Sequence, residues 1–197
     1  MIDYPSIEYC YPNVLGRTCV VSEKIDGHNI RAEYAKGEFK KFGSRKMLVG
    51  PDSEDRMFAR GVRMFHEKYA DALKKAMKKL RISKGVVFGE LYGAECHIAR
   101  IDYKVDMAWT FFDIADVEKK QFISARDVVN TFVECEVPTP TFTIEHVDNN
   151  LINAVREDRT PGKEGMVFKP QQVRKPSLKL QYAKAKTAWF MERIGEV

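Results

Sequence analysis

The chain has 197 residues, of which 44% are hydrophobic and 31% are charged, and its formal net charge is +5. This length suits one domain, or one and a half at most, and the composition is typical of soluble globular proteins. We expect no membrane span, because no apolar run approaches the length that crosses a bilayer, and the positive charge is a mild lean towards polyanions.

The start of the chain and its cysteines point to a cytoplasmic protein. Residues 1–5 have neither the basic nor the apolar region of a secretion signal. Four cysteines are scattered along the chain without the spacing of metal ligands, which favours reduced thiols.

The N-terminal half is predicted to form strands followed by one long helix. After an irregular stretch to residue 16, short alternating runs and a Lys36-Gly37 turn indicate antiparallel strands at residues 17–24, 28–35 and 38–43. An apolar stripe then predicts a helix over residues 54–81, capped by Asp52 or Ser53. The opposite face of this helix is rich in Lys and Arg, and it is either a solvated surface or a flank that faces phosphates.

The C-terminal half alternates between strands and helices. Glycine-flanked and aromatic-rich runs predict strands at residues 85–93 and 106–115, and a helix begins at Ser124 and ends near Cys135. Further on we expect a strand at 141–146, a helix at about 148–157, strands at 165–169 and 177–182, and a short terminal helix. Because this order lacks βαβ regularity, we predict an α+β fold with mainly antiparallel sheets flanked by helices.

The stretch from Ser22 to Asn29 separates two β-like runs and contains Lys24. Its Asp26-Gly27 pair favours a tight hairpin turn, because glycine adopts a positive φ without steric cost. Two interpretations follow from this segment alone. Lys24 is either a surface residue at the rim of a hairpin, or a nucleophile held at the edge of a sheet.

Further motifs follow this stretch in a particular order. The series is Glu23-Lys24-Ile25-Asp26-Gly27, Gly43-Ser44-Arg45, Phe88-Gly89-Glu90-Leu91-Tyr92-Gly93, Phe111-Phe112-Asp113-Ile114 and Glu164-Gly165-Met166-Val167-Phe168-Lys169-Pro170, with Lys184-Ala185-Lys186 beyond. It resembles the covalent nucleotidyltransferase superfamily of ATP-dependent DNA and RNA ligases and mRNA capping enzymes. The third and fifth motifs are most similar to the RNA ligases that seal nicks in duplex RNA. The resemblance spans about residues 20 to 190.

The resemblance implies that Lys24 takes AMP from ATP and releases pyrophosphate. The AMP would pass to a 5′-phosphate RNA end, and a 3′-OH would then attack to form a phosphodiester. Lysine attacks phosphorus only as the neutral amine. Lys184, Lys186 and a bound Mg²⁺ or Mn²⁺ are candidate cations that would favour this form and offset charge on the α-phosphate. Residues 178–181 also match the last motif of the family, but Gln181 then stands in place of the second lysine. Without the resemblance, Lys184 and Lys186 are simply a basic run at the start of a helix.

Three further residues receive roles from the same resemblance. Glu90 would accept hydrogen bonds from the ATP ribose, and Lys169 would position Lys24 or the phosphates. Glu164 would help to hold a divalent metal, since Mg²⁺ is usually bound by one or two carboxylates together with phosphates. Without the resemblance, the sequence indicates only that Glu90 is a carboxylate on an edge strand and that Glu164 is a turn residue.

The remaining implied ATP contacts come from aromatic, basic and polar side chains. Phe112 or Phe111 would stack on adenine, and because neighbouring strand residues face opposite ways only one can do so; we favour Phe112. Arg45 suits phosphate or ribose contact through its fork of donors, or is a solvent-exposed loop charge. Glu23 and Asn29 are the last two implied ATP-binding residues, and Asn29 would contact a phosphate or the incoming strand.

We expect residues 1–197 to form a single nucleotidyltransferase (adenylation) domain. The superfamily's OB domain, or the RNA ligases' own C-terminal domain, would follow the last motif, and neither fits in residues 187–197. A partner chain is one source of such a domain. RNA ends or a nicked duplex are the expected substrates, and the alternatives are a capping-type guanylyltransferase, a minimal DNA ligase or a non-catalytic RNA-binding module.

Overall fold

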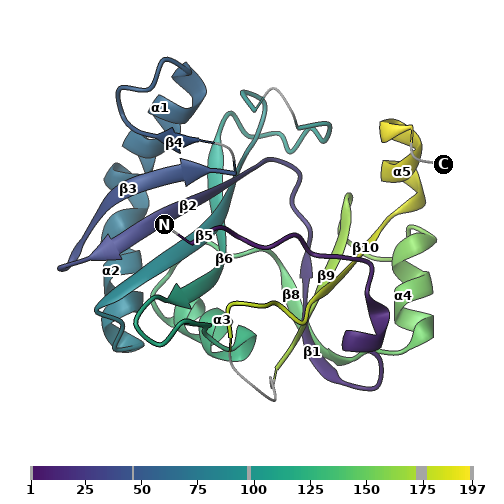
Figure 1. Ribbon diagram of the computed structural model, residues 1–197. Coiled ribbons are helices and arrows are strands. Elements are labelled where there is room, and N and C mark those ends of the chain that lie inside the picture. The colour runs from purple at the N-terminus through teal and green to yellow at the C-terminus, as the bar shows by residue number, and fades with distance from the viewer. Residues whose placement is uncertain (1, 46, 97–98, 172–176, 196–197) are drawn as a thin grey trace.

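The computed structural model describes residues 2–45, 47–96, 99–171 and 177–195. It contains a six-stranded and a four-stranded sheet, both antiparallel, with helices packed beside them (Figure 1). The predicted α+β fold is confirmed. All four cysteines are free thiols.

The two sheets are built from different parts of the chain. In order across the large sheet, the strands are β4 (Leu48–Val49), β3 (Glu38–Ser44), β2 (His28–Ala35), β5 (Lys84–Tyr92), β6 (Ala108–Asp116) and β7 (Gln121–Phe122). Across the small sheet they are β10 (Ala183–Lys186), β9 (Gly165–Pro170), β1 (Thr18–Glu23) and β8 (Phe142–His146).

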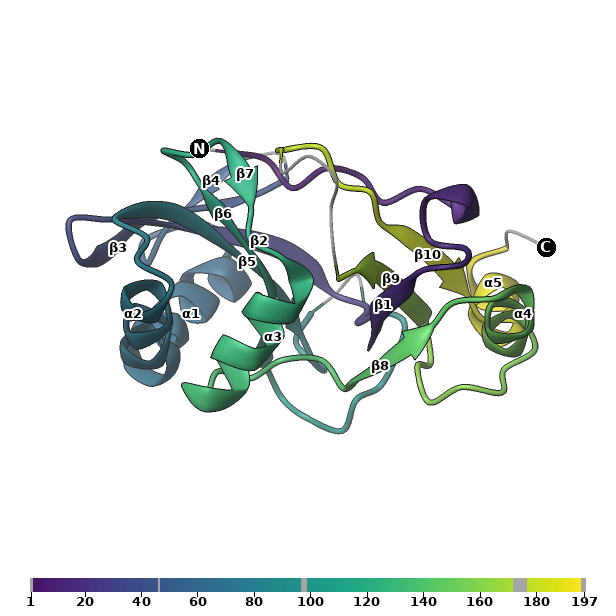
Figure 2. The same ribbon diagram turned by 90° about the horizontal axis from the view of Figure 1, so that it is seen from below.

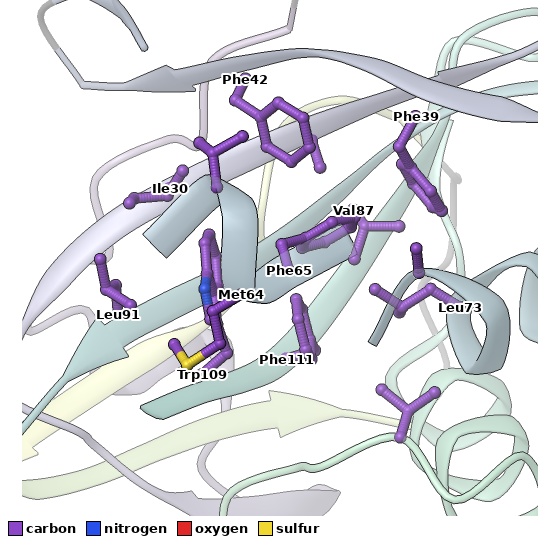
Figure 3. Packing of buried hydrophobic residues seen from close by; sticks show 14 of the residues in the cluster. Ile30, Phe39, Phe42, Met64, Phe65, Leu73, Val87, Leu91, Trp109 and Phe111 are labelled. Carbon is purple, nitrogen blue, oxygen red and sulfur yellow. The ribbon is translucent and has the colours of Figure 1, made fainter. Parts of the chain in front are cut away.

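The predicted long helix lies against one face of the large sheet. It consists of α1 (Arg56–Met64), a π-helical turn η2 (Phe65–Tyr69) and α2 (Ala70–Lys79). Phe65 is fully buried at the centre of the core, where its ring meets rings from β3 and β6 (Figure 3). The predicted caps Asp52 and Ser53 are wrong, because the helix begins later and the Asp55 side chain accepts the amides of its first turn.

Charged residues on the outer side of this helix pair with carboxylates. Lys74 Nζ lies 2.8 Å from a carboxylate oxygen of Glu38, and Lys79 pairs with Glu134. Arg60 likewise pairs with a glutamate of the loop after β5. These pairs favour a solvated helix surface over a phosphate-facing flank.

The remaining helices cover the other parts of the two sheets. They are α3 (Ala125–Glu134), α4 (Asn149–Arg156), α5 (Ala188–Ile194) and a 3-10 turn η1 (Tyr11–Asn13). α3 lies on the same side of the large sheet as α1 and α2, whereas α4 and α5 lie beside the small sheet (Figure 2). Among the described residues, no helix is long and apolar enough to cross a membrane.

The Asp26-Gly27 segment does not form the predicted hairpin. β1 pairs with β8 and β9, whereas β2 pairs with β3 and β5, so the segment crosses from the small sheet to the large one. Glycine is required here for close packing: a Cβ on Gly27 would lie 2.4 Å from the carbonyl oxygen of Leu91. Asp26 fixes the crossover by accepting the backbone amides of Arg100 and Ile101, at 2.5 and 3.2 Å.

The second predicted turn does connect neighbouring strands. Lys36 and Gly37 join β2 to β3 with φ angles of 54° and 83°, so both adopt the left-handed conformation of a two-residue hairpin loop.

The strand predicted at residues 177–182 is wrong, and the strand lies instead at Ala183–Lys186. Leu178 and Leu180 pack against an aromatic cluster that includes Tyr4, rather than pairing with a sheet. The buried Ala183 and Ala185 alternate with lysines in β10, which pairs with β9. The lysines are therefore strand residues and not the start of a helix.

The N-terminal segment spans both sheets. The ring of Tyr4 packs on Phe88 of the large sheet, with ring centroids 5.0 Å apart. Four residues later, the carbonyl of Glu8 accepts the backbone amide of Lys184 in the small sheet. In Figure 1 this segment crosses the molecule from the large sheet to the small one.

Candidate active site

A pocket lies where the two sheets and the N-terminal segment meet. Its lining residues are Tyr4, Ile7, Ser22, Glu23, Lys24, Ile25, Asn29, Arg45, Glu90, Phe112, Pro140, Val167, Lys169 and Lys184. Eight of the ten predicted site residues are in this set. The other two, Glu164 and Lys186, lie next to it, and Glu164 contacts Lys24 directly.

Lys24 and Glu164 form an ion pair at the ends of the two inner strands of the small sheet. Lys24 directly follows β1, and its backbone amide donates to the carbonyl of Gly165 at 2.9 Å. This bond joins the end of β1 to the start of β9 and brings the two side chains together. Lys24 Nζ lies 2.5 Å from Glu164 Oε1, and the Lys24 side chain is 27% exposed.

The Glu164 carboxyl group is buried but only half satisfied. Burial raises its pKa above the ordinary value, and the positive charge of Lys24 opposes this shift. Its Oε2 atom is buried without a hydrogen-bond partner among the described residues. A carboxylate oxygen left in this way suits a hard divalent cation. No group of three or more candidate ligands occurs in the described part of the chain, so a metal here would take its other ligands from substrate phosphates and water.

Glu90 and Asn29 face each other across β5 and β2. Asn29 pairs with Glu90 in the register of the two strands, and its side chain donates a hydrogen bond to the carboxyl group. Burial raises the pKa of Glu90 to about 8, and the charge of Lys24 opposes this shift. The Glu90 carboxyl group is therefore mostly protonated at neutral pH, and it can then also donate a hydrogen bond.

A β-bulge distinguishes Phe112 from Phe111. Phe88 pairs with Asp113 and Gly89 pairs with Phe111, which leaves Phe112 as an extra residue on β6. Phe111 is fully buried and stacks on Trp109, whereas Phe112 lines the pocket. Bulges commonly redirect a side chain next to a functional site, and here the pocket-facing phenylalanine is the one that we favoured.

Lys169 is held in a buried network that the sequence analysis did not find. Its Nζ atom lies 2.8 Å from Asp113 Oδ2 and donates to the carbonyl oxygen of Phe112 at the same distance. Asp113 also accepts the hydroxyl groups of Tyr4, at 2.6 Å, and Tyr182, at 3.2 Å. Burial and then the charge of Asp113 raise the pKa of both phenols well above the ordinary value, so both remain donors. The sequence around Tyr4 shows no periodic pattern that predicts a role for it. The only available signal was that Asp113, if buried, needs hydrogen-bond donors.

Lys184 and Lys186 project from the same face of β10. Lys184 lines the pocket, and burial lowers its pKa below the ordinary value, with further lowering by the charges of Lys24 and Lys186. Lys186 lies close enough to lower the pKa of Glu164 by its charge. Gln181, from the competing motif register, is not a lining residue of this pocket and accepts a hydrogen bond from Arg17. The geometry therefore favours the register with the two lysines of β10.

A family model described as RNA ligase matches residues 17–186. The chain belongs to the RNA ligase family. The match begins just before β1 and ends at Lys186, so it includes every one of the ten predicted site residues. A search of curated proteins found no significant match.

Solved structures of the Naegleria gruberi RNA ligase share this fold. An apo mutant has a TM-score of 0.72 and 13% identity, and the match covers 100% of this chain and 59% of that chain. The structure of this ligase with PPi gives the same values. A mutant with ATP and Mn matches with 14% identity and a TM-score of 0.72. The present chain thus corresponds to about three-fifths of the length of the Naegleria protein.

Proposed function

We propose that this RNA ligase family member is an ATP-dependent RNA ligase that works through a lysyl-AMP at Lys24. The observation that carries the proposal is the 2.5 Å contact between Lys24 Nζ and Glu164 Oε1 beside a pocket that also holds Glu90, Phe112 and Lys184. A nucleophile, an aromatic surface and a cation thus line one cavity, with a buried carboxylate beside the nucleophile. The Naegleria structures with ATP and Mn support ATP and a divalent metal as its ligands.

The first step is the transfer of AMP to Lys24. Lys24, whose side chain is 27% exposed, first loses an ammonium proton to water, and the charges of Lys184, Lys186 and a bound divalent cation would favour the neutral amine. The neutral amine then attacks the α-phosphorus of ATP. An N–P bond forms while the bond from the α-phosphorus to the bridging oxygen breaks, and pyrophosphate leaves with the electron pair.

The next two steps use RNA ends. An oxygen of a 5′-phosphate attacks the adenylate phosphorus, the N–P bond breaks, and the Lys24 amine regains a proton. A 3′-OH then attacks the activated 5′-phosphate, loses its proton and releases AMP as the phosphodiester forms.

The other pocket residues bind and orient the nucleotide. Phe112 stacks on adenine, and Glu90 bonds the ribose. Lys184 and Lys186 offset the charge that develops on the α-phosphate. Arg45 contacts a phosphate or the ribose, Asn29 contacts a phosphate, and Lys169 positions Lys24 or the phosphates. Glu23 is the remaining ATP-binding residue. A bound Mg²⁺ or Mn²⁺ would neutralise phosphate charge, and Glu164 Oε2 is the atom that would hold it.

Labelling with α-labelled ATP tests this function. Wild-type protein with Mg²⁺ or Mn²⁺ should become covalently labelled, and Lys24→Ala should take no label. Lys163→Ala is the matched control, because this exposed lysine neighbours Glu164 in sequence and is not a lining residue of the pocket. Labelled wild-type protein should then seal nicked duplex RNA.

Several outcomes would contradict the proposal. Equal labelling of wild type and Lys24→Ala would show that Lys24 is not the nucleophile. Labelling by GTP in place of ATP would indicate a capping-type guanylyltransferase, and sealing of nicked DNA alone would indicate a minimal DNA ligase. RNA binding without any labelling would indicate a non-catalytic module.

A further inference from the structure

A second hollow lies beside the proposed active site, on the small-sheet side of the molecule. Its lining residues are Tyr9, Tyr11, Arg156, Lys186, Ala188 and Met191. They come from the N-terminal segment with η1, the end of α4, the end of β10 and the start of α5. We call this surface the Tyr9 hollow. Apart from Lys186, its lining residues belong neither to the ATP pocket nor to the motif series.

β10 connects the Tyr9 hollow to the ATP pocket. Lys184 lines the ATP pocket and Lys186, two residues later on the same face of the strand, lines the hollow. Lys184 also reaches the hollow, since its Nζ lies 4.9 Å from the ring centroid of Tyr9. The two lysines therefore connect the hollow to the ATP pocket along one face of β10.

The hollow presents an aromatic surface. Tyr9 is 45% exposed, although tyrosine rings are usually at least partly covered. The backbone around it is fixed, since the carbonyl of Glu8 accepts the amide of Lys184 and the carbonyl of Tyr9 accepts the amide of Tyr11. An exposed ring on a fixed backbone is suited to stacking with a base.

The hollow is also basic. The Arg156 guanidinium lies 5.0 Å over the ring of Tyr11, which holds it at the rim. Together with Lys186 it provides two positive charges, and no acidic residue is among the lining residues that the structure describes. On the neighbouring α5, Arg193 lies over the ring of Trp189, which is 39% exposed, and this extends the same combination.

We infer that the Tyr9 hollow binds an unpaired strand of RNA. A base stacks on Tyr9, and the adjoining phosphates contact Arg156 and Lys186. Exposed aromatic rings next to positive charges are the features by which proteins hold single strands without reading their sequence. A protein partner would require an apolar or acidic surface to match, and the hollow favours the anionic strand. This inference rests on the proposed function, because it names the surface that delivers an RNA end to Lys24.

Fluorescence anisotropy with a labelled single-stranded RNA oligonucleotide tests the inference. Tyr9→Ala should weaken binding by about fivefold or more, the effect of losing one base stack, whereas Tyr9→Phe should bind like wild type. Arg156→Ala should reduce the slope of log affinity against log salt by about 0.7, because one phosphate contact is lost. Arg159→Ala is the matched control: it lies three residues further along the chain, pairs with Glu157, and should change neither quantity.

The outcomes separate this inference from the proposed function. Equal RNA affinity of wild type, Tyr9→Ala and Arg156→Ala would overturn the role of the hollow, and so would equal losses for Tyr9→Phe and Tyr9→Ala. ATP labelling of wild-type Lys24 would leave the proposed function standing in either case. If wild-type protein took no label but Tyr9→Ala still lost RNA affinity, the ligase proposal would fail while the hollow remained an RNA site.

Discussion

At the scale of single residues, burial raises the pKa of the two carboxyl groups beside Lys24. The pKa values of both Glu90 and Glu164 are raised, chiefly by loss of contact with water, and the charge of Lys24 opposes both shifts. The neutral form of Glu90 adds no negative charge to the pocket, which favours an anionic ligand there. The same burial makes the stability of the folded state depend on pH between 4.5 and about 8.

We predict that Glu90 makes the protein less stable as pH rises towards 8. The pKa of Glu90 rises from an ordinary value of 4.5 to about 8 on folding. Between these two values the folded state binds a proton that the unfolded state releases, so the free energy of unfolding falls as pH increases. The melting temperature of wild type should therefore decline relative to that of Glu90→Gln across this interval.

Thermal melts of the two proteins over a pH series provide the measurement. Glu164 shifts in the same direction, but it is present in both proteins and cancels in the difference. Melting curves that stay parallel from acid to alkaline pH would show that the Glu90 proton is not linked to folding.

At the scale of elements, the crossover between β1 and β2 positions the site. It leaves the small sheet at Lys24 and enters the large sheet at His28, and it carries Asp26 and Gly27 between them. The carboxylate of Asp26 is satisfied by two backbone amides of the loop after β5. Gly27 lies against β5, the strand that carries Glu90. Lys24 and Glu90 reach the same pocket because this short segment packs tightly.

We predict that Gly27→Ala both destabilises the protein and reduces ATP labelling. The added Cβ would lie 2.4 Å from the Leu91 carbonyl oxygen, so the crossover must move, at a cost of about 1–3 kcal/mol. Lys24 is three residues away and would move with it. Gly50→Ala is the control, since a Cβ there meets nothing within 4 Å and its stability should be unchanged or slightly higher. Urea unfolding and label incorporation measure the two effects, and an unfolding midpoint equal for both variants would contradict the prediction.

Local patterns in the sequence predicted the elements that depend on neighbours along the chain. The apolar stripe of residues 54–81 gave the long helix, and Lys36-Gly37 gave a true hairpin. Asp26-Gly27 carries the same turn signal, but it joins two sheets, because strand pairing is decided by distant segments such as β5 and β9. The strand at residues 183–186 was missed for the same reason: its two alanines have no strong strand propensity until β9 lies beside them.

The candidate site was found in the sequence through motif order rather than through structure. The order gathered residues that lie 140 positions apart, such as Lys24 and Glu164, which no local pattern relates. It did not identify Tyr4 or Tyr182, since their role arises only from contact with the buried Asp113. The bulge that leaves Phe112 as the extra residue on β6 is likewise a property of the paired strands.

At the scale of the whole molecule, the two sheets have separate hydrophobic clusters that share no residue among those described. The larger cluster joins the large sheet to α1, α2 and α3, and the smaller one joins the small sheet to α4. The N-terminal segment contacts both sheets, the large one through Tyr4 and the small one through the carbonyl of Glu8. The pocket is lined by residues of both sheets, and the segment that joins the sheets also lines it through Tyr4 and Ile7.

We predict that removal of residues 1–8 lowers both thermal stability and ATP labelling. The truncation removes the Tyr4 donor to Asp113, exposes Phe88 and Phe122, and leaves the amide of Lys184 without its backbone acceptor. Loss of a hydrogen bond to a buried carboxylate alone costs about 1.5–3 kcal/mol. Labelling should fall further than stability explains, because Lys169 and Lys184 both lose a neighbour that fixes them.

Asp3→Ala is the control for this truncation. It deletes only the ion pair between Arg31 and a carboxylate that is 75% exposed, a contact worth about 1 kcal/mol or less. Labelling should be compared at a temperature where circular dichroism shows both proteins folded. A folded truncated chain that takes label at the wild-type rate would mean that the two sheets hold Lys24, Glu90 and Lys169 in register by themselves, and that the segment covers the pocket without shaping it.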